Sequence, residues 1–329
     1  MATMANADRD IAAIARTVSG ELERPAPREA SVLTDEICRR HGSAVAAVVY
    51  YGSCLRRASS EGGVLDFYVL VDSYRAAYDK RRLAWSNAML PPNVFYLELA
   101  DGDDTIRTKY AVMSVQDFAR AASSKSLHSI VWSRFSQPAL LTYARDEKAR
   151  ASVVRSLVDA VLTMVAHLLV FMPADAGRVR FTPEELWQNG FRETYGAEFR
   201  TEQPETIAQV YDAAPLRYDA VTAHALRVLE RRGWLRLESD GDPLEVAMVR
   251  RRRTAVLLRW RVRRPIAKAL QIPRLIKSAL TFGDWLPYAL FKLGRHTGIK
   301  IELTERQRRR PLIWGWPVFF RLLREQALR

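Results

Sequence analysis

The chain has 329 residues, 48% of them hydrophobic, which is enough for two folded domains and a tail. Its two cysteines, Cys38 and Cys54, exclude a disulfide framework and a zinc-binding spacing, and they favour a reducing compartment that faces the cytosol. The net charge of +14 is concentrated in residues 241–329, which hold 21 Lys and Arg against 6 Asp and Glu. An acidic partner is therefore expected there: a membrane surface, a nucleic acid or a phosphorylated substrate.

The first elements alternate between helix and strand. Residues 1–8 lack a basic start and a long apolar stretch, so no secretory signal is expected. Residues 1–30 are weakly patterned and are expected to form a short helix and a linker. The apolar spacing of residues 31–41 predicts a helix that Gly42 ends. Apolar runs at 45–51 and 64–71 predict two strands on either side of a Gly-Ser bend.

The next segment completes a mixed sheet domain. Residues 74–89 predict a helix or a loop. Residues 94–99 and 106–114 predict two strands, because the Asp-Gly-Asp-Asp turn between them is a hairpin signal. A helix is expected at 115–122. This mixture over residues 31–145 indicates an α+β domain and not a regular parallel array.

Residues 146–240 predict a helical or winged-helix-like second domain. A helical period runs from 146 to 172, and its most apolar stretch is too short and too polar to span a membrane. We therefore expect a buried helix with His167 as a core residue. Thr182 is expected to cap the next helix, since Pro183 and two acidic residues follow it. The domain is predicted to end with a helix and a short strand: residues 218–232 and 234–238.

Residues 241–329 interleave basic with apolar side chains. Arginines alternate with Val, Leu and Trp from 250 to 268, and aromatic residues gather at 314–320 between further arginines. Basic groups attract anionic lipid by about 1 kcal/mol each, and Trp and Phe settle at the headgroup boundary. The segment therefore predicts a basic amphipathic region that binds a membrane surface. The alternative is a solvated basic face with ordinary core aromatics.

The Gly52-Ser53 bend and Asp66 form the pattern with the most chemical content. Backbone N–H groups after such a bend can hold phosphate oxygens, and a carboxylate on the following strand can hold Mg²⁺ against them. A strand, a Gly-Ser bend and a second strand that carries a carboxylate resemble the segment that binds the nucleoside triphosphate and its metal in the nucleotidyltransferase superfamily. The same pattern also fits an ordinary strand–turn–strand in which Asp66 is a solvated strand residue.

Five local motifs follow one another along the chain. They are Tyr51-Gly52-Ser53, Asp66-Phe67 with Val71-Asp72, Lys109-Tyr110, Ser133-Arg134-Phe135 with Gln137-Pro138, and Glu198-Phe199-Arg200. Their order and rough spacing resemble the peripheral, mitochondrial-type phosphatidate cytidylyltransferases, the translocator-maintenance family. The resemblance covers about residues 45–240.

The resemblance implies a nucleotidyltransferase-like sheet domain and an enzyme of phospholipid biosynthesis. It implies that the enzyme, with Mg²⁺ as its cofactor, converts CTP and phosphatidic acid to CDP-diacylglycerol and pyrophosphate. It also implies a cytoplasmic protein that is peripheral on the inner face of the membrane, with no nucleic acid as partner. Asp66 and Lys109 are then the expected catalytic residues. The residues expected to bind nucleotide or phosphate are Gly52, Ser53, Asp72, Arg134 and Arg200.

Position 68 departs from the superfamily pattern, which has two carboxylates two residues apart. Tyr68 stands where the second is expected, and Asp72 is about 20 Å from Asp66 along an extended strand. Glu98 on the next strand-like run is the best alternative metal ligand. Solvated or strand-end roles stay open for Glu98, Asp72 and Lys109, and surface ion pairs stay open for Arg134 and Arg200.

Two other functions fit the same sequence. A nucleotidyltransferase acting on RNA or on another phosphorylated acceptor would use the basic tail as its groove. A non-catalytic, membrane-associated scaffold would explain the tyrosine at position 68.

Overall fold

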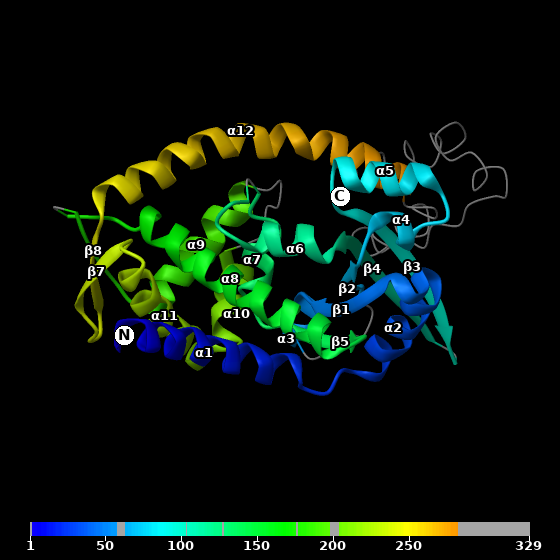
Figure 1. Ribbon diagram of the computed structural model, residues 1–329, viewed down its shortest axis with the longest axis horizontal. Coiled ribbons are helices and arrows are strands. Elements are labelled where there is room, and N and C mark those ends of the chain that lie inside the picture. The colour runs from blue at the N-terminus through cyan, green and yellow to red at the C-terminus, as the bar shows by residue number, and fades with distance from the viewer. Residues whose placement is uncertain are drawn as a thin grey trace, which may run out of the picture.

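The computed structural model describes residues 2–57, 63–102, 104–126, 128–175, 177–197 and 204–281. They form the expected α+β fold, with a five-stranded mixed sheet and a helical unit beside it (Figure 1). The strands of the larger sheet are β1 (Val45–Tyr51), β2 (Leu65–Val71), β3 (Asn93–Asp101), β4 (Asp104–Ser114) and β5 (Leu140–Ala144).

The larger sheet has the strand order β3-β4-β2-β1-β5. Only β2 and β4 run parallel, and the other neighbours are antiparallel. The register pairs Tyr51 with Asp66 and Asp66 with Lys109, so the predicted site residues meet on adjacent strands. The predicted Asp-Gly hairpin joins β3 to β4, where Asp101 pairs with Asp104.

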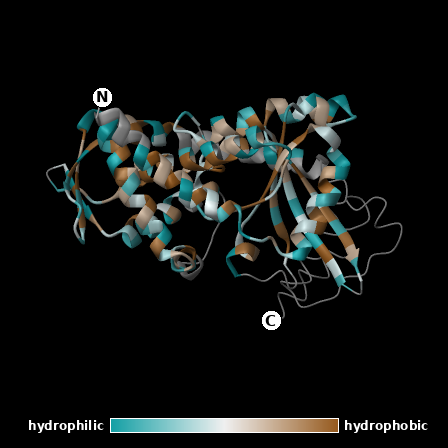
Figure 2. Ribbon diagram, turned by 60° about the horizontal axis from the view of Figure 1, so that its bottom comes forward, coloured by the Kyte–Doolittle hydropathy of each residue, from teal (hydrophilic) through white to brown (hydrophobic). Residues whose placement is uncertain are grey.

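The two faces of this sheet are covered by different helices. Phe67, Val69 and Val71 point to a core that includes α2 (Arg28–His41), while Asp66, Tyr68 and Leu70 point to the opposite face. That second face packs against the helical unit, and hydrophobic residues line both sides of the contact (Figure 2). Three short helices belong to the sheet domain near these faces: α4 (Tyr74–Ala77), α5 (Arg81–Met89) and α6 (Val115–Ala122).

The second unit combines helices with a small antiparallel sheet. Its elements in chain order are α8 (Glu147–Phe171), β6 (Arg178–Phe181), α9 (Pro183–Ala197), α10 (Pro204–Asp212), α11 (Pro215–Arg231), β7 (Leu235–Ser239) and β8 (Leu244–Met248). The small sheet has the order β6-β8-β7, in which β6 and β8 were not anticipated from the sequence. Thr182 begins α9 as expected: its hydroxyl accepts from the Glu185 N–H, and the Glu185 carboxylate accepts from the Thr182 N–H.

The N-terminal segment is a larger element than the short helix expected. α1 (Ala2–Leu22) runs along the helical unit and buries Ile14, Val18 and Leu22 in its core (Figure 1). Polar contacts reinforce it, because Asp10 binds the side chains of His224 and Arg231 on α11. The apolar side chains recur every three to four residues, which is the helical period.

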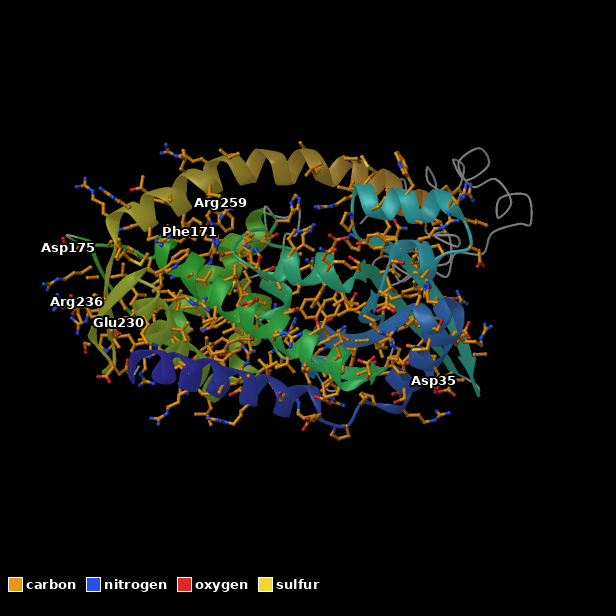
Figure 3. The ribbon with its side chains drawn as sticks, in the orientation of Figure 1. Asp35, Phe171, Asp175, Glu230, Arg236 and Arg259 are labelled. Carbon is orange, nitrogen blue, oxygen red and sulfur yellow. The ribbon has the colours of Figure 1, made fainter. Side chains whose placement is uncertain are left out.

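α12 (Arg250–Thr281) is a single long helix that extends from the small sheet to α5 (Figure 1). Its buried Trp260 donates a hydrogen bond from Nε1 to Nδ1 of His167 at 2.8 Å, and the ring of Trp132 stacks on His167 at 5.2 Å. Phe171, at the end of α8, also meets Trp260 edge-on beneath this helix, close to Arg259 (Figure 3). His167 is therefore a core histidine, as predicted.

α8 is the central helix of the protein. Among the described helices, it alone is long and apolar enough to cross a membrane, and 83% of its most apolar window is buried inside the protein. This burial agrees with the expected core helix. The aromatic part of the predicted membrane-binding region, including residues 314–320, lies outside the described residues.

Candidate active site

The Gly-Ser bend forms at the end of β1 and brings the chain against Asp66. Gly52 has a φ of +100°, which residues with a side chain rarely adopt. A Cβ atom at this position would lie 3.0 Å from Oδ2 of Asp66. Both the backbone angle and the close contact therefore favour glycine. Ser53 follows the bend directly as the first residue of α3 (Ser53–Arg57).

Asp66 and Lys109 form an ion pair across two parallel strands. Nζ of Lys109 lies 3.1 Å from Oδ1 of Asp66, and the side chains are 33% and 20% exposed. The register places the two residues opposite each other on one face of the sheet. Solvent and small ligands can thus reach a carboxylate and an ammonium group at the bend. The structure brings together four of the predicted site residues: Gly52, Ser53, Asp66 and Lys109.

Arg56 adds a basic group that was missed in reading the sequence. It lies in the first turn of α3, and its Nη1 donates to Oε1 of Gln137 at 3.1 Å. This bond ties the bend to the segment before β5, which belongs to another predicted motif. An arginine three residues after Ser53 was the available signal, because basic side chains near a phosphate-binding bend supply charge-assisted hydrogen bonds.

The structure gives a physical reason for the tyrosine at position 68. Its side chain points to the same face as Asp66 but is 2% exposed. Its ring lies 5.6 Å from that of Tyr51, 5.8 Å from Phe118 and 5.1 Å from Phe135. An ionised carboxylate in this aromatic cluster would be strongly destabilising. The fold therefore uses position 68 for packing between the sheet and the helices that carry Phe118 and Phe135.

Glu98 is not beside Asp66. It lies on β3, two strands away from β2, and inter-strand spacing alone separates the two strands by about 10 Å. Its Oε1 accepts hydrogen bonds from the Tyr96 hydroxyl at 2.5 Å and from Nε of Arg107 at 2.9 Å. Glu98 thus takes part in a local cross-strand network, and the structure does not join it to the bend.

Asp72 lies at the opposite end of β2 from Asp66. Its two oxygens accept from Nη1 and Nη2 of Arg145 at 2.5 and 3.1 Å. This pair, with Asp146, raises the pKa of Arg145 above its usual value. The backbone N–H of Asp72 also donates to the carbonyl of Ala44. These contacts fit the strand-end role that the sequence left open.

The two predicted phosphate-binding arginines have different outcomes. Arg134 lies in α7 (Trp132–Phe135), and its Nη1 donates to the carbonyl of Ile130 at 2.7 Å. Phe135 packs this short helix onto Tyr51 and Tyr68, so Arg134 belongs to the layer that covers the Asp66 face. Arg200, with Glu198 and Phe199, lies outside the described residues.

The residues at the bend fit a magnesium–nucleotide complex in a limited way. Within the described ranges, no group of three or more His, Cys, Asp or Glu side chains gathers at one point. Magnesium in nucleotide sites is usually bound by one or two carboxylates together with substrate phosphates and water. A single carboxylate held against a glycine bend is compatible with that mode. Asp66 is then the side chain that would hold the ion.

Comparison with known proteins adds no assignment to this geometry. No family model matches the chain, and no curated protein matches it closely enough to be a relative.

Proposed function

We propose that this protein is a phosphatidate cytidylyltransferase that makes CDP-diacylglycerol and pyrophosphate at a membrane surface. The observation that carries the proposal is the contact between Gly52 and Asp66, with Lys109 3.1 Å from the same carboxylate. It brings one residue from each of the first three ordered motifs to one partly exposed point of the sheet. Arg56 joins the fourth motif, through Gln137, to the same bend.

The reaction needs alignment and charge neutralisation more than covalent help from the protein. A phosphate oxygen of phosphatidate attacks the α-phosphorus of CTP, the bond to the bridging oxygen breaks, and pyrophosphate leaves. The phosphate monoester is largely ionised near neutral pH, so a strong general base is not required. Magnesium, when bound, neutralises charge on the triphosphate.

Each residue at the bend then has one task. Gly52 lets the backbone approach the triphosphate, and the first N–H groups of α3 have no acceptor within the helix, so they are available to phosphate oxygens. Asp66 would hold the ion. Lys109 neutralises Asp66 and supplies positive charge where negative charge develops on the α-phosphate. Arg56 is placed to bind a further phosphate oxygen near Gln137.

The outer face of α12 supports action at a membrane. Leu258 and Val262 are 61% and 51% exposed and lie one turn apart. Exposed arginines flank them: Arg251, Arg259 and Arg261. Apolar side chains beside basic ones on an exposed helix are typical of elements that lie in the interface of an anionic membrane.

We expect the Leu258→Glu and Val262→Glu double variant to bind anionic vesicles at least about tenfold more weakly than the wild type, since burying each apolar side chain contributes about 1.5–3 kcal/mol. Vesicle flotation measures this. Leu216→Glu is the control, because Leu216 is 83% exposed but lies on α11. Equal flotation of the wild type and the double variant would remove α12 from the membrane contact. The substitutions are preferable to deleting α12, which would remove Trp260 from the core.

The activity itself is tested with purified full-length protein, labelled CTP, Mg²⁺ and phosphatidate in vesicles. The expected product is labelled CDP-diacylglycerol, with pyrophosphate released in equal amount. Label transfer to RNA and not to lipid would favour the RNA-directed alternative. A protein that binds vesicles but transfers no label with any divalent metal or acceptor would be the scaffold, for which the aromatic packing of Tyr68 is the supporting observation.

A further inference from the structure

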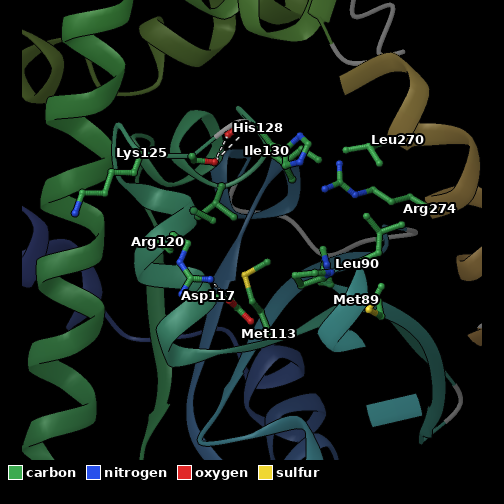
Figure 4. Close-up of a pocket in the computed structure, with 15 residues that line it drawn as sticks. Met89, Leu90, Met113, Asp117, Arg120, Lys125, His128, Ile130, Leu270 and Arg274 are labelled. Carbon is green, nitrogen blue, oxygen red and sulfur yellow. Dashed lines mark hydrogen bonds and ion pairs between the residues drawn. The ribbon is translucent and has the colours of Figure 1, made fainter. Parts of the chain in front are cut away.

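A cavity lies away from the Gly-Ser bend, where α12 crosses the sheet domain. It has a volume of about 410 Å³ and is bounded by α6, by the turn at Leu90–Pro92 that follows α5, and by α12 (Figure 4). This volume is within the range of small-molecule sites, about 300–1,000 Å³. Its position is separate from the candidate active site. Met113 on its wall is four residues along β4 from Lys109, a distance of about 13 Å. The buried Tyr68 on β2 is paired with Ala111, which lies between these two residues of β4.

The lining of this cavity combines apolar with basic side chains, and α12 contributes one of each, Leu270 and Arg274 (Figure 4). Met89, Leu90, Met113 and Leu270 contribute apolar walls. Four basic side chains also line it: Arg120, Lys125, His128 and Arg274. Among the lining residues that the structure describes, Asp117 is the one acid.

The negative charge of Asp117 is already engaged. Its Oδ1 accepts from Nη1 of Arg120 at 3.0 Å, and its Oδ2 accepts from the hydroxyls of Tyr74 at 2.7 Å and Ser114 at 2.9 Å. The negative charge of Asp117 is therefore already compensated by Arg120. Figure 4 shows the Arg274 guanidinium directed from α12 toward the interior of the cavity.

Positive charge is crowded at this end of α12. Lys277, one turn after Arg274, donates through Nζ to the carbonyls of Leu90 and Pro92, the latter at 2.7 Å. Burial, together with the nearby Arg274, lowers the pKa of Lys277 to about 8. Like charges one turn apart on a helix repel. An anion placed near Arg274 would relieve this repulsion and hold α12 against the sheet domain.

We propose that this cavity binds an anionic amphiphile, with its hydrocarbon chain along the apolar wall and its phosphate or carboxylate head at Arg274. An apolar cavity with a few convergent polar groups is the general form of a small-molecule site, and a guanidinium pairs well with either head. The site does not depend on the proposed transferase activity, since it shares no residue with the bend.

The test is a calorimetric titration of the full chain with single-chain probes kept below their micelle concentrations. Dodecyl phosphate and dodecanoate carry the two anionic heads, dodecyl maltoside carries the chain without charge, and inorganic phosphate carries the head without a chain. We expect at least one of the two anionic probes to bind with one site per chain. Dodecyl maltoside and inorganic phosphate should bind at least about tenfold more weakly. The tighter of the two anionic probes identifies the head.

Variants separate the two parts of the site. Arg274→Ala should weaken binding of the anionic probe at least about tenfold, and Arg274→Lys should recover part of it. Arg250→Ala, at the exposed first residue of the same helix, should leave binding unchanged. Ala121→Phe should weaken binding by filling the cavity, with an unchanged circular dichroism spectrum as the test of folding.

Three results would overturn the proposal: wild-type affinity in a folded Arg274→Ala variant, equal binding of dodecyl maltoside and the anionic probes, or unchanged binding in a folded Ala121→Phe variant. Loss of binding in Asp66→Asn would place the ligand at the bend and would also overturn it. None of these results depends on whether CTP is turned over, so the two proposals fail independently.

Discussion

Replacing Asp66 by asparagine should lower cytidylyl transfer from CTP to phosphatidate by about 10²–10³-fold while the protein remains folded. The substitution keeps the side-chain shape but removes the charge that would hold magnesium and pair with Lys109 at 3.1 Å. Loss of one preorganised electrostatic group in an active site typically has an effect of about this size. Stability should change by less than about 1 kcal/mol, because a partly exposed ion pair contributes little. The measurement is initial-rate kinetics, with urea unfolding of the same sample.

Asp72→Asn is the matched control. Asp72 directly follows the last residue of β2 and also pairs with a basic side chain, Arg145, but at the opposite end of this strand from Asp66. Its loss should leave turnover within about twofold of the wild type. An equal fall in both variants would show that the effect does not arise at the bend, and normal turnover in Asp66→Asn would end the assignment of Asp66.

Gly52→Ala should lower turnover by about 100-fold and also destabilise the fold. The left-handed backbone region costs an alanine about 1–2 kcal/mol. The new methyl group would also lie 3.0 Å from Oδ2 of Asp66, so the carboxylate or the bend must move. A displacement of about 1 Å in an active site is enough for a 100-fold effect. Steady-state kinetics and thermal unfolding measure the two consequences separately.

Gly102→Ala separates backbone strain from displacement of Asp66. Gly102 has a φ of +66°, but a Cβ atom there would meet nothing within 4 Å. This variant should lose stability through the backbone alone and keep its turnover. If the turnover of Gly52→Ala equals that of Gly102→Ala, the close contact between position 52 and the Asp66 carboxylate has no part in catalysis.

Local signals explain the elements that were predicted correctly. The Thr182 cap, the turn at Gly102 and the stop at Gly42 each depend on a few neighbouring residues, so the sequence determines them without knowledge of distant contacts. The same holds for the Gly52 bend, where an apolar strand ends in a residue that tolerates a positive φ.

The partners of charged and aromatic side chains were not predictable in the same way. Glu98 was chosen as a metal ligand because it lies on a strand, but its network with Tyr96 and Arg107 depends on the pairing of β3 with β4. The tyrosine at position 68 is explained only by Phe118 and Phe135, which lie far along the chain and pack against it.

By itself, the sequence of this protein determined the order of most elements, the glycine-dependent bend, and the concentration of basic charge in the last quarter. These features follow from backbone preferences and composition, which act within a few residues. Only the tertiary structure decided that Lys109 and Asp66 pair and that Trp260 of α12 donates a hydrogen bond to His167. It also decided that α12 forms one wall of a cavity lined in part by basic side chains. Such contacts join residues 43 to 187 positions apart. Strand register and helix packing select them among many alternatives with similar local sequence.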